Sequence, residues 1–306
     1  MNESDTVQRT TLGAVEVLRI IERHGAFLPT AEFLPGAAPE VWERNADWLA
    51  PDHWEPESGK TVTALQTWVL RSGGRTVVID TLAGSMRVRP GMEGHFHLQE
   101  SDLLDRLARA GVHPEDVDTV VNTHLHVDHV GWNTRDADGD WVPTFPRAQY
   151  LIPAADDAHY GPANTTGTGL KEVDRLVYAD SIAPIHRAGQ AVLWDGEHRI
   201  DDNLVLEPAP GHTPGSCVVR LESGGDRAVF VGDLMHSPVQ IVDPCCNSSA
   251  CYEPERAVAS RRRILERAAD ERELVVPGHF GGAGAVEVRR DGGGFTLGAW
   301  AGFAPA

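Results

Sequence analysis

The chain has 306 residues, of which 41% are hydrophobic, so it can bury a sizeable core in one large domain or two small ones. Lys and Arg number 27 against 45 Asp and Glu, which gives a formal net charge of -18 at pH 7. This charge repels nucleic acid phosphates and anionic membrane surfaces, so it excludes both as expected partners and favours a neutral or weakly polar small molecule.

The N-terminal residues 1–11 are polar and acidic and lack the cationic head and apolar run of a secretory signal. Because no apolar stretch approaches the ~18 residues that cross a bilayer, we expect a cytoplasmic protein. None of the four cysteines has the C-x-x-C spacing of a structural zinc site. Reduced thiols fit that location, while a labile disulfide among Cys245, Cys246 and Cys251, or a place near the functional site, stays open.

The first elements expected along the chain are strands. Residues 12–21 alternate as a half-buried strand, and 64–70 and 75–80 flank a glycine turn as a hairpin. Residues 25–60 are rich in Pro, Gly, Trp and acidic side chains without a clear period, which predicts an irregular arm over the mouth of a site. We therefore divide the chain into an N-terminal strand and arm, 1–60, and a catalytic core, 61–306, within one structural domain.

Helices and further strands alternate in the remainder of the chain. Amphipathic patterns predict helices over Ser101–Ala110, Lys171–His186 and Glu253–Ala269. Four short apolar runs each end just before a candidate metal ligand: Val117–Val121 before His124, Leu204–Leu206 before His212, Ala228–Val231 before Asp233, and Leu274–Val276 before His279. This alternation predicts an α/β fold with a site built at strand ends.

The densest chemical signal is Thr123-His124-Leu125-His126-Val127-Asp128-His129. Three imidazoles and a carboxylate on one loop have few structural uses, and they suit zinc, iron, manganese or cobalt. The sequence therefore predicts a metal site, with the metal's identity less well defined than its presence.

This H-x-H-x-D-H loop resembles the hallmark of the metallo-β-lactamase superfamily. Gly211-His212-Thr213-Pro214-Gly215, Val231-Gly232-Asp233 and Pro277-Gly278-His279 follow it in the family's order. The resemblance implies the four-layer αβ/βα sandwich of that fold and two metal ions, zinc above all. It assigns His124, His126 and His212 to the first ion, Asp128, His129 and His279 to the second, and Asp233 as the bridge between them.

The chemistry implied is hydrolysis, because a hydroxide between two cations exists near neutral pH and can attack a polarised carbonyl. Asp128, a ligand beside that hydroxide, is our candidate to pass a proton to the leaving group. Within the superfamily, residues 122–133 and 141–146 resemble the branch of quorum-quenching lactonases and organophosphorus hydrolases. His236 stands where the best-known acyl-homoserine lactonases carry tyrosine, which favours the organophosphorus-hydrolase side. His236 either donates a hydrogen bond to substrate or supports a ligand.

Four side chains near the ligand loop are candidates for an apolar substrate pocket. Trp132, Trp141 and Phe145 follow the loop closely, and Met86 lies in a glycine-containing segment with Met92 and Phe96. Ordinary core packing is the competing interpretation.

The leading hypothesis is hydrolysis of a lactone or related ester of a small, partly apolar substrate, with lactonase activity suggested by the resemblance. A phosphotriesterase or arylesterase and a thioesterase are alternatives on the same site, and an iron-dependent oxidoreductase is the alternative from another class. By analogy, the N-terminal arm suggests a homodimer.

Overall fold

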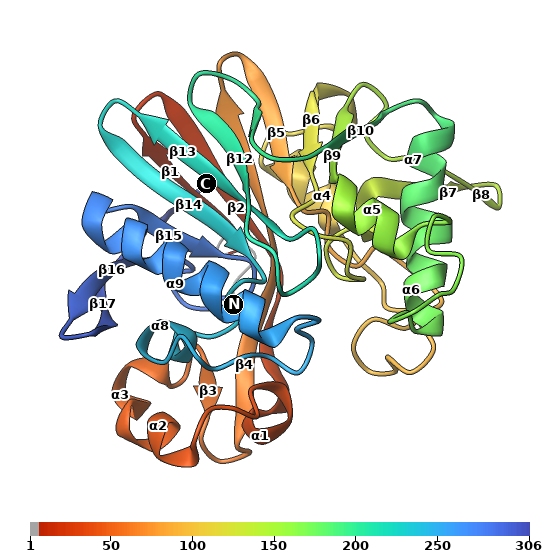
Figure 1. Ribbon diagram of the computed structural model, residues 1–306. Helices are drawn as coiled ribbons and strands as arrows, with labels where there is room; N and C mark the ends of the chain where they lie inside the picture. Colours follow the sequence, from red (N-terminus) through yellow and green to blue (C-terminus); the bar gives the residue numbers. More distant parts are fainter. Residues whose placement is uncertain (1–5) are drawn as a thin grey trace.

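Two large β-sheets lie face to face in the computed structural model, which describes residues 6–306 (Figure 1). The first five residues of the polar N-terminal stretch therefore lie outside the described residues. In the part described, the first sheet runs β10-β9-β6-β5-β4-β2-β1-β18, with β3 paired to β4. Its strands are β1 (Val7–Leu12), β2 (Val15–Pro29), β3 (Trp54–Glu55), β4 (Lys60–Ser72), β5 (Arg75–Ile79), β6 (Thr119–Val121), β9 (Gln149–Pro153), β10 (Ala191–Trp194) and β18 (Ala304–Pro305).

The second sheet is mostly antiparallel, with one parallel pair between β14 and β15. Over the described range its order follows the chain, from β11 to β17. Its strands are β11 (His198–Arg199), β12 (Leu204–Pro208), β13 (Cys217–Ser223), β14 (Asp226–Gly232), β15 (Leu274–Pro277), β16 (Val286–Asp291) and β17 (Gly294–Trp300). A separate hairpin joins β7 (Thr134–Ala137) to β8 (Asp140–Pro143), as the acidic turn Asp138-Gly139 requires.

Helices cover the outer faces of both sheets, and α9 lies along the second sheet in Figure 1. The α-helices are α1 (Thr30–Phe33), α2 (Pro39–Arg44), α3 (Ala46–Leu49), α4 (Leu103–Arg109), α5 (Ala154–Tyr160), α6 (Glu172–Val177), α7 (Ala183–Arg187), α8 (Val239–Val242) and α9 (Pro254–Glu271). Short 3₁₀ turns η2 (Pro114–Asp116) and η3 (Gly131–Asn133) and the π-helical turn η4 (Tyr178–Ile182) complete the set. Among residues 6–306, no helix combines the length and apolar character of a bilayer-spanning segment.

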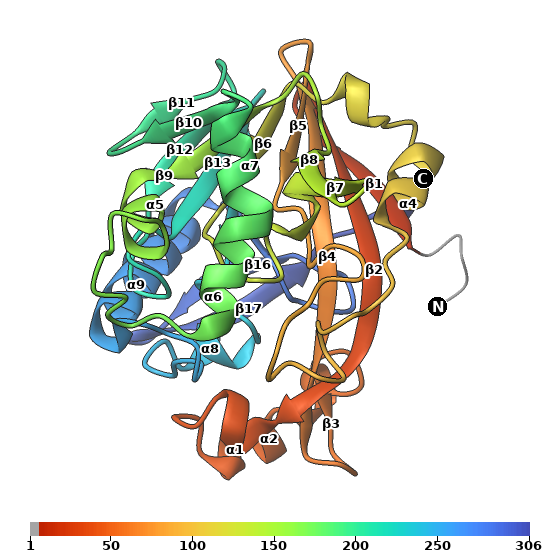
Figure 2. The ribbon, with the colours of Figure 1, turned by 90° about the vertical axis from the view of Figure 1, so that its right-hand side faces the viewer.

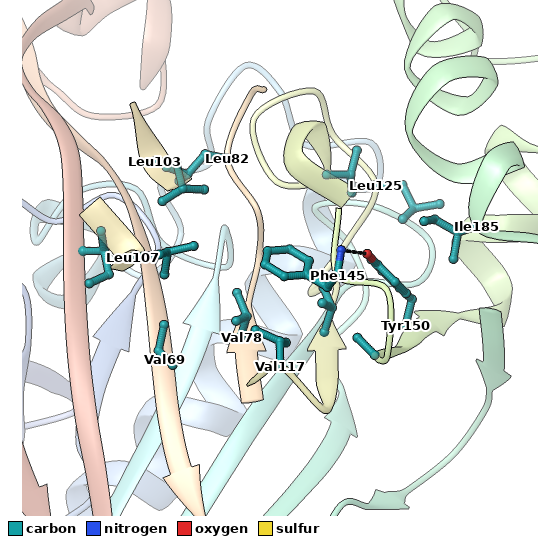
Figure 3. Packing of buried hydrophobic residues seen from close by; sticks show 14 of the residues in the cluster. Val69, Val78, Leu82, Leu103, Leu107, Val117, Leu125, Phe145, Tyr150 and Ile185 are labelled. Carbon is teal, nitrogen blue, oxygen red and sulfur yellow. Dashed lines mark hydrogen bonds between the residues drawn. The ribbon is translucent and has the colours of Figure 1, made fainter. Parts of the chain in front are cut away.

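Alternation along the strands divides the apolar side chains among three cores. On β5, Val77 and Ile79 face the core between the sheets, while Val78 faces the core under α4, α6 and α7. Figure 3 shows this outer core, which includes Val78, Phe145 and Tyr150. A third core packs α9 on the outer face of the second sheet. These layers confirm the predicted four-layer sandwich, because period-two alternation lets each sheet bury both faces.

The N-terminal part is more regular than the sequence predicts. Gly13 takes a φ of +58°, and the turn it makes divides the strand expected over 12–21 into β1 and β2. Residues 25–29 continue β2, and three helices of four to six residues occupy much of the expected irregular arm. In Figure 2, β2 and β4 run side by side toward this arm. Because residues 7–29 pair into the first sheet, we propose that 1–60 and 61–306 form one structural domain.

The expected helix over Lys171–His186 is also interrupted, since the π-helical turn η4 separates α6 from α7. The hairpin expected over 64–80 forms as β4 and β5, and the helices expected over Ser101–Ala110 and Glu253–Ala269 form as α4 and α9. The boundaries shift by a few residues because helix ends are set by caps and tertiary contacts rather than by periodicity.

Candidate metal centre

The ligand candidates lie just past the ends of strands from both sheets. The loop that follows β6 in the first sheet carries four of them, at 124–129. The loops after β12, β14 and β15 of the second sheet carry His212, Asp233 and His279. The two sheets therefore bring together residues that are far apart in sequence, on loops held by rigid strands.

The seven side chains form two adjoining groups. In each group, one potential ligand atom per residue lies within 4.8 Å of the others. The first group is His124, His126, His212 and Asp233, and the second is Asp128, His129 and His279. This division matches the assignment that the sequence resemblance implies.

Asp233 faces both groups with a different carboxylate oxygen. Its Oδ2 lies 3.4 Å from His212 Nε2 and 3.7 Å from His124 Nε2. Its Oδ1 lies 3.2 Å from His129 Nε2 and 3.0 Å from His279 Nε2. A carboxylate between two nitrogen clusters is the arrangement that a bridging ligand requires.

The donor set fits two divalent cations. His124 Nε2 is buried without a hydrogen-bond partner, and His212 Nε2 and His126 Nδ1 face each other at 2.9 Å. Burial lowers the pKa of His124 and of His126 well below the ordinary histidine value, so both imidazoles are neutral. Burial opposes ionisation of Asp233, but His129, His279 and His236 outweigh it and hold its pKa well below the ordinary value. Burial opposes protonation of His129, His212 and His279 as well, but contact with Asp233 outweighs it and raises the pKa of all three. Metal ions bind neutral imidazoles and an ionised carboxylate, so metal binding at these three histidines is accompanied by loss of any proton they hold.

Asp80 supports the second group although sequence reasoning missed it. Its Oδ2 lies 2.8 Å from His129 Nδ1, and its two oxygens accept hydrogen bonds from the backbone N and the Oγ1 of Thr123, each at 2.7 Å. Asp80 follows β5 with a φ of +60°, which turns its carboxylate toward the ligand loop. The available signal was an aspartate directly after a buried apolar strand, the same position that marks Asp233.

We expect Asp80→Asn to weaken the second metal site about 10–100-fold, because an amide cannot accept from His129 and Thr123 with both of its atoms. Metal affinity measured by competition with a chelating dye, together with kcat/KM, would test this. Asp118→Asn is the matched control, since the carboxylate of Asp118, the residue before β6, accepts from the backbone N of Thr76 in β5. Equal affinities in both variants would contradict the positioning role of Asp80.

A second missed carboxylate, Asp156, ties two ligand loops together. Its Oδ2 accepts from the backbone N of Leu125 at 3.1 Å and from Thr213 Oγ1 at 2.9 Å, and its Oδ1 accepts from Gly215 N at 2.6 Å. Burial raises the pKa of Asp156 to about 6, against these hydrogen bonds, which lower it. The loops carrying His126 and His212 are thus held at a fixed separation.

His236 contacts the bridging carboxylate. Its Nε2 lies 3.0 Å from Asp233 Oδ2, and its buried Nδ1 has no hydrogen-bond partner. Burial lowers the pKa of His236 to about 4 although Asp233 acts to raise it, so the ring is neutral. A neutral ring that donates from Nε2 to Asp233 has only an acceptor left at Nδ1. This geometry favours support of Asp233 over donation to a substrate oxygen.

A cavity of about 730 Å³ opens above the two ligand groups. Its lining includes Asp128, Asp233 and His279 at the floor, and Phe27 and Phe33 from the N-terminal arm. The arm is anchored by apolar contacts of Leu34, Trp42 and neighbouring residues with Val239 and Cys246. Residues of the segment 25–60 therefore form part of the cavity lining.

The structure corrects the expected substrate pocket, because the residues that line the cavity do not include Trp132, Trp141, Phe145 or Met86. Phe145 is fully buried in the outer core, as Figure 3 shows. The indole of Trp132 donates to Ser101 Oγ at 2.7 Å, and Trp141 lies against the Arg87 guanidinium at 3.6 Å. Met86 is 54% exposed.

Trp132, Trp141 and Phe145 turn away because the chain leaves the ligand loop through η3 and enters the β7–β8 hairpin outside the first sheet, whereas Met86 lies in the exposed part of the segment between β5 and α4. Met92 and Phe96, the other two candidates in the glycine-containing segment, do line the cavity. Cys251 lines it too, with its Sγ 3.8 Å from His212 Nδ1, and all four cysteines are unpaired. Of the alternatives left open for the cysteine cluster, a position near the site holds for Cys251.

Two groups of histidines and aspartates at the strand ends of a four-layer sandwich indicate a metal-binding protein. Residues 62–279 match the model of the Metallo-beta-lactamase superfamily. The chain therefore belongs to the metallo-β-lactamase superfamily, whose fold and ligand motifs it carries throughout.

Curated relatives and solved structures agree with this membership. An N-acyl homoserine lactonase from a Bacillus species is 25% identical over 185 residues, which is 59% of this chain and 63% of the relative. The match thus spans less than two thirds of that relative's length. The structure is similar to the hydrolase AbOPH, with a TM-score of 0.78, 22% identity, and coverage of 95% of this chain and 96% of that one. It is also similar to AidC, a dizinc quorum-quenching lactonase in complex with a product, N-hexnoyl-L-homoserine, with a TM-score of 0.77, 20% identity and the same coverage.

Proposed function

We propose that this protein is a dinuclear, zinc-dependent hydrolase that opens a lactone or a related ester of a small, partly apolar substrate. The observation that carries the proposal is the pair of ligand groups joined by Asp233 at the floor of a cavity of about 730 Å³. The cavity's apolar lining, from Phe27, Phe33 and Leu65, suits an acyl chain. Relatives and structural neighbours that bear lactonase names add weight to the lactone over other esters.

Two metal ions, when bound, lower the pKa of water at the site and polarise the carbonyl that is attacked. The residues of the chain would hold the metal ions and transfer a proton. Asp233 is held ionised between the two groups and is oriented by His236. Asp128 lines the cavity with its side chain 15% exposed, and its Oδ2 lies 3.6 Å from His279 Nε2. That position lets Asp128 pass a proton to the leaving oxygen.

Acid release from a panel of compounds tests the proposal. The panel contains acyl-homoserine lactones, simple lactones, an aryl ester, a thioester and a phosphotriester, each followed in weak buffer with a pH indicator. We expect the metal-loaded protein to cleave lactones with the highest kcat/KM, and chelation followed by zinc return to abolish and restore the reaction. Failure on every lactone with both metals bound would overturn the assignment, and the remaining compounds would then identify the reaction.

A further inference from the structure

Lysine is rare in this chain, and both of its lysines line the same cavity. Lys60 and Lys171 are the only lysines of the sequence, and every other side chain among the 27 cationic residues is an arginine. Lys60 begins β4 and is half-buried, whereas Lys171 precedes α6 and is exposed. Two different elements therefore each contribute one lysine to the lining of the same cavity.

Acidic residues neighbour both lysines, Glu55 opposite Lys60 in the β3–β4 pair and Asp174 in the first turn after Lys171. Within residues 6–306, the ammonium groups of Lys60 and Lys171 form no ion pair. Arg23, the third cation of the lining, is held in place by a hydrogen bond to the backbone O of His95 at 3.1 Å and by the ring of Phe96. Unpaired lysines are compact charges with three donors each, and they suit a ligand that brings its own negative charge.

The cavity wall differs in charge from the chain as a whole. Apart from Asp128 and Asp233 of the ligand groups, Asp174 is the acid among the lining residues, and it accepts a hydrogen bond from the backbone N of Lys171 at 2.7 Å. Burial lowers the pKa of His95, and the charges of Arg23 and Lys60 lower it further, against Glu32. The lining thus carries three cations, Arg23, Lys60 and Lys171, against three acids, two of which are metal-ligand candidates. Because screening limits exposed charges to a reach of about 8 Å, this local balance, and not the net charge of -18, is what a ligand in the cavity meets.

Aromatic rings connect the metal centre to this cationic rim. The ring of Phe33 lies 5.1 Å from that of His236, and the ring of Phe27 lies 5.2 Å from Phe33 and 4.8 Å from His95. The rings therefore lead along the wall from the metal centre, through two phenylalanines, to His95. The charges of Arg23 and Lys60 act on His95. A ligand that fills it has a hydrolysable head, an apolar middle and a charged tail.

We propose that the substrate is an anion, a lactone or ester whose acyl chain ends in a carboxylate held by Lys60 and Lys171 at the rim of the cavity. This inference rests on the proposed hydrolytic function and replaces the neutral substrate that the net charge alone favours. The carboxylate lies at the end of the molecule remote from the bond that is cleaved, so it selects the substrate without taking part in the reaction.

Two matched compounds test the proposal: N-hexanoyl-homoserine lactone and the analogue in which a carboxylate replaces the terminal methyl group. We expect the metal-loaded wild type to prefer the carboxylate compound in kcat/KM. We expect Lys60→Gln combined with Lys171→Gln to reduce the ratio between the two compounds about tenfold, as does high salt. Arg289→Gln is the control, because it removes one positive charge from an exposed site on β16 outside the cavity.

Calorimetric titration with the two open-chain acids, which need no turnover, separates the two hypotheses. Tighter binding of the dicarboxylate to wild type than to the double variant supports the lysine site even if no lactone is cleaved. Cleavage of both lactones with equal kcat/KM, and a ratio unchanged in the double variant, overturns the anionic substrate and leaves the hydrolase standing. Absence of any cleavage, with the dicarboxylate still preferred in the titration, overturns the hydrolase alone.

Discussion

Replacing Asp233 by alanine will reduce lactone kcat/KM by about three orders of magnitude, equivalent to roughly 4 kcal/mol of transition-state stabilisation. The reason is that the two oxygens of Asp233 face the two ligand groups, at 3.0 and 3.2 Å on one side and 3.4 and 3.7 Å on the other. Its loss removes a ligand from both metals and the acceptor that orients His236. Metal content by mass spectrometry and steady-state kinetics would measure the effect.

The control for this variant is Asp202→Ala, which removes an exposed carboxylate from the turn before β12. Asp233→Asn is a second variant that preserves shape if alanine leaves the histidine cluster unable to fold. It retains one oxygen, so we expect it to keep metal better than alanine. Full metal content and full activity in the Asp233→Ala protein would contradict a bridging role.

The metal-ligand candidates could be predicted from the sequence because four of the seven lie within six consecutive residues. His124, His126, Asp128 and His129 stand on one loop, and each remaining ligand follows an apolar run that ends in a short turn. Strand ends of a layered fold meet at one edge, so such residues converge whatever the details of packing. The supporting carboxylate Asp80 sits at an equivalent position, but a single aspartate carries no spacing that separates it from other aspartates.

The residues that line the cavity could not be predicted from the sequence in this way. Phe27 and Phe33 belong to the arm, and Tyr252 precedes α9, so the cavity is assembled from parts that no sequence window contains. Nearness in sequence to the ligand loop pointed instead to Trp132, which the structure places against Ser101. The helices of the arm have four to six residues, too few for a 3.6-residue period to be detected.

Composition also concealed how the charge is arranged. A net charge of -18 favours a neutral ligand, but the net charge does not say where on the molecule the individual charges lie. Lys60 and Lys171 lie 111 positions apart in the chain, and both line the cavity because β4 and the start of α6 border it. Because salt screens charges beyond a short distance, a substrate in the cavity interacts with the charges that line it and not with the net charge of the chain.

Removing the metals will lower the melting temperature as well as abolish turnover. Seven donors converge in the two groups, with a 2.9 Å hydrogen bond between the imidazoles of His126 and His212, and bound cations would hold all seven donors together from both sheets. A metal present at 1,000 times its Kd stabilises the fold by about 4 kcal/mol, which corresponds to a shift on the order of 10 °C. Thermal unfolding before chelation, after it and after zinc return would measure the shift. The same treatment of Asp233→Ala, which lacks the shared ligand, should give a much smaller one. A chelated wild type that keeps its melting temperature and its turnover would show that these donors do not hold the catalytic metal.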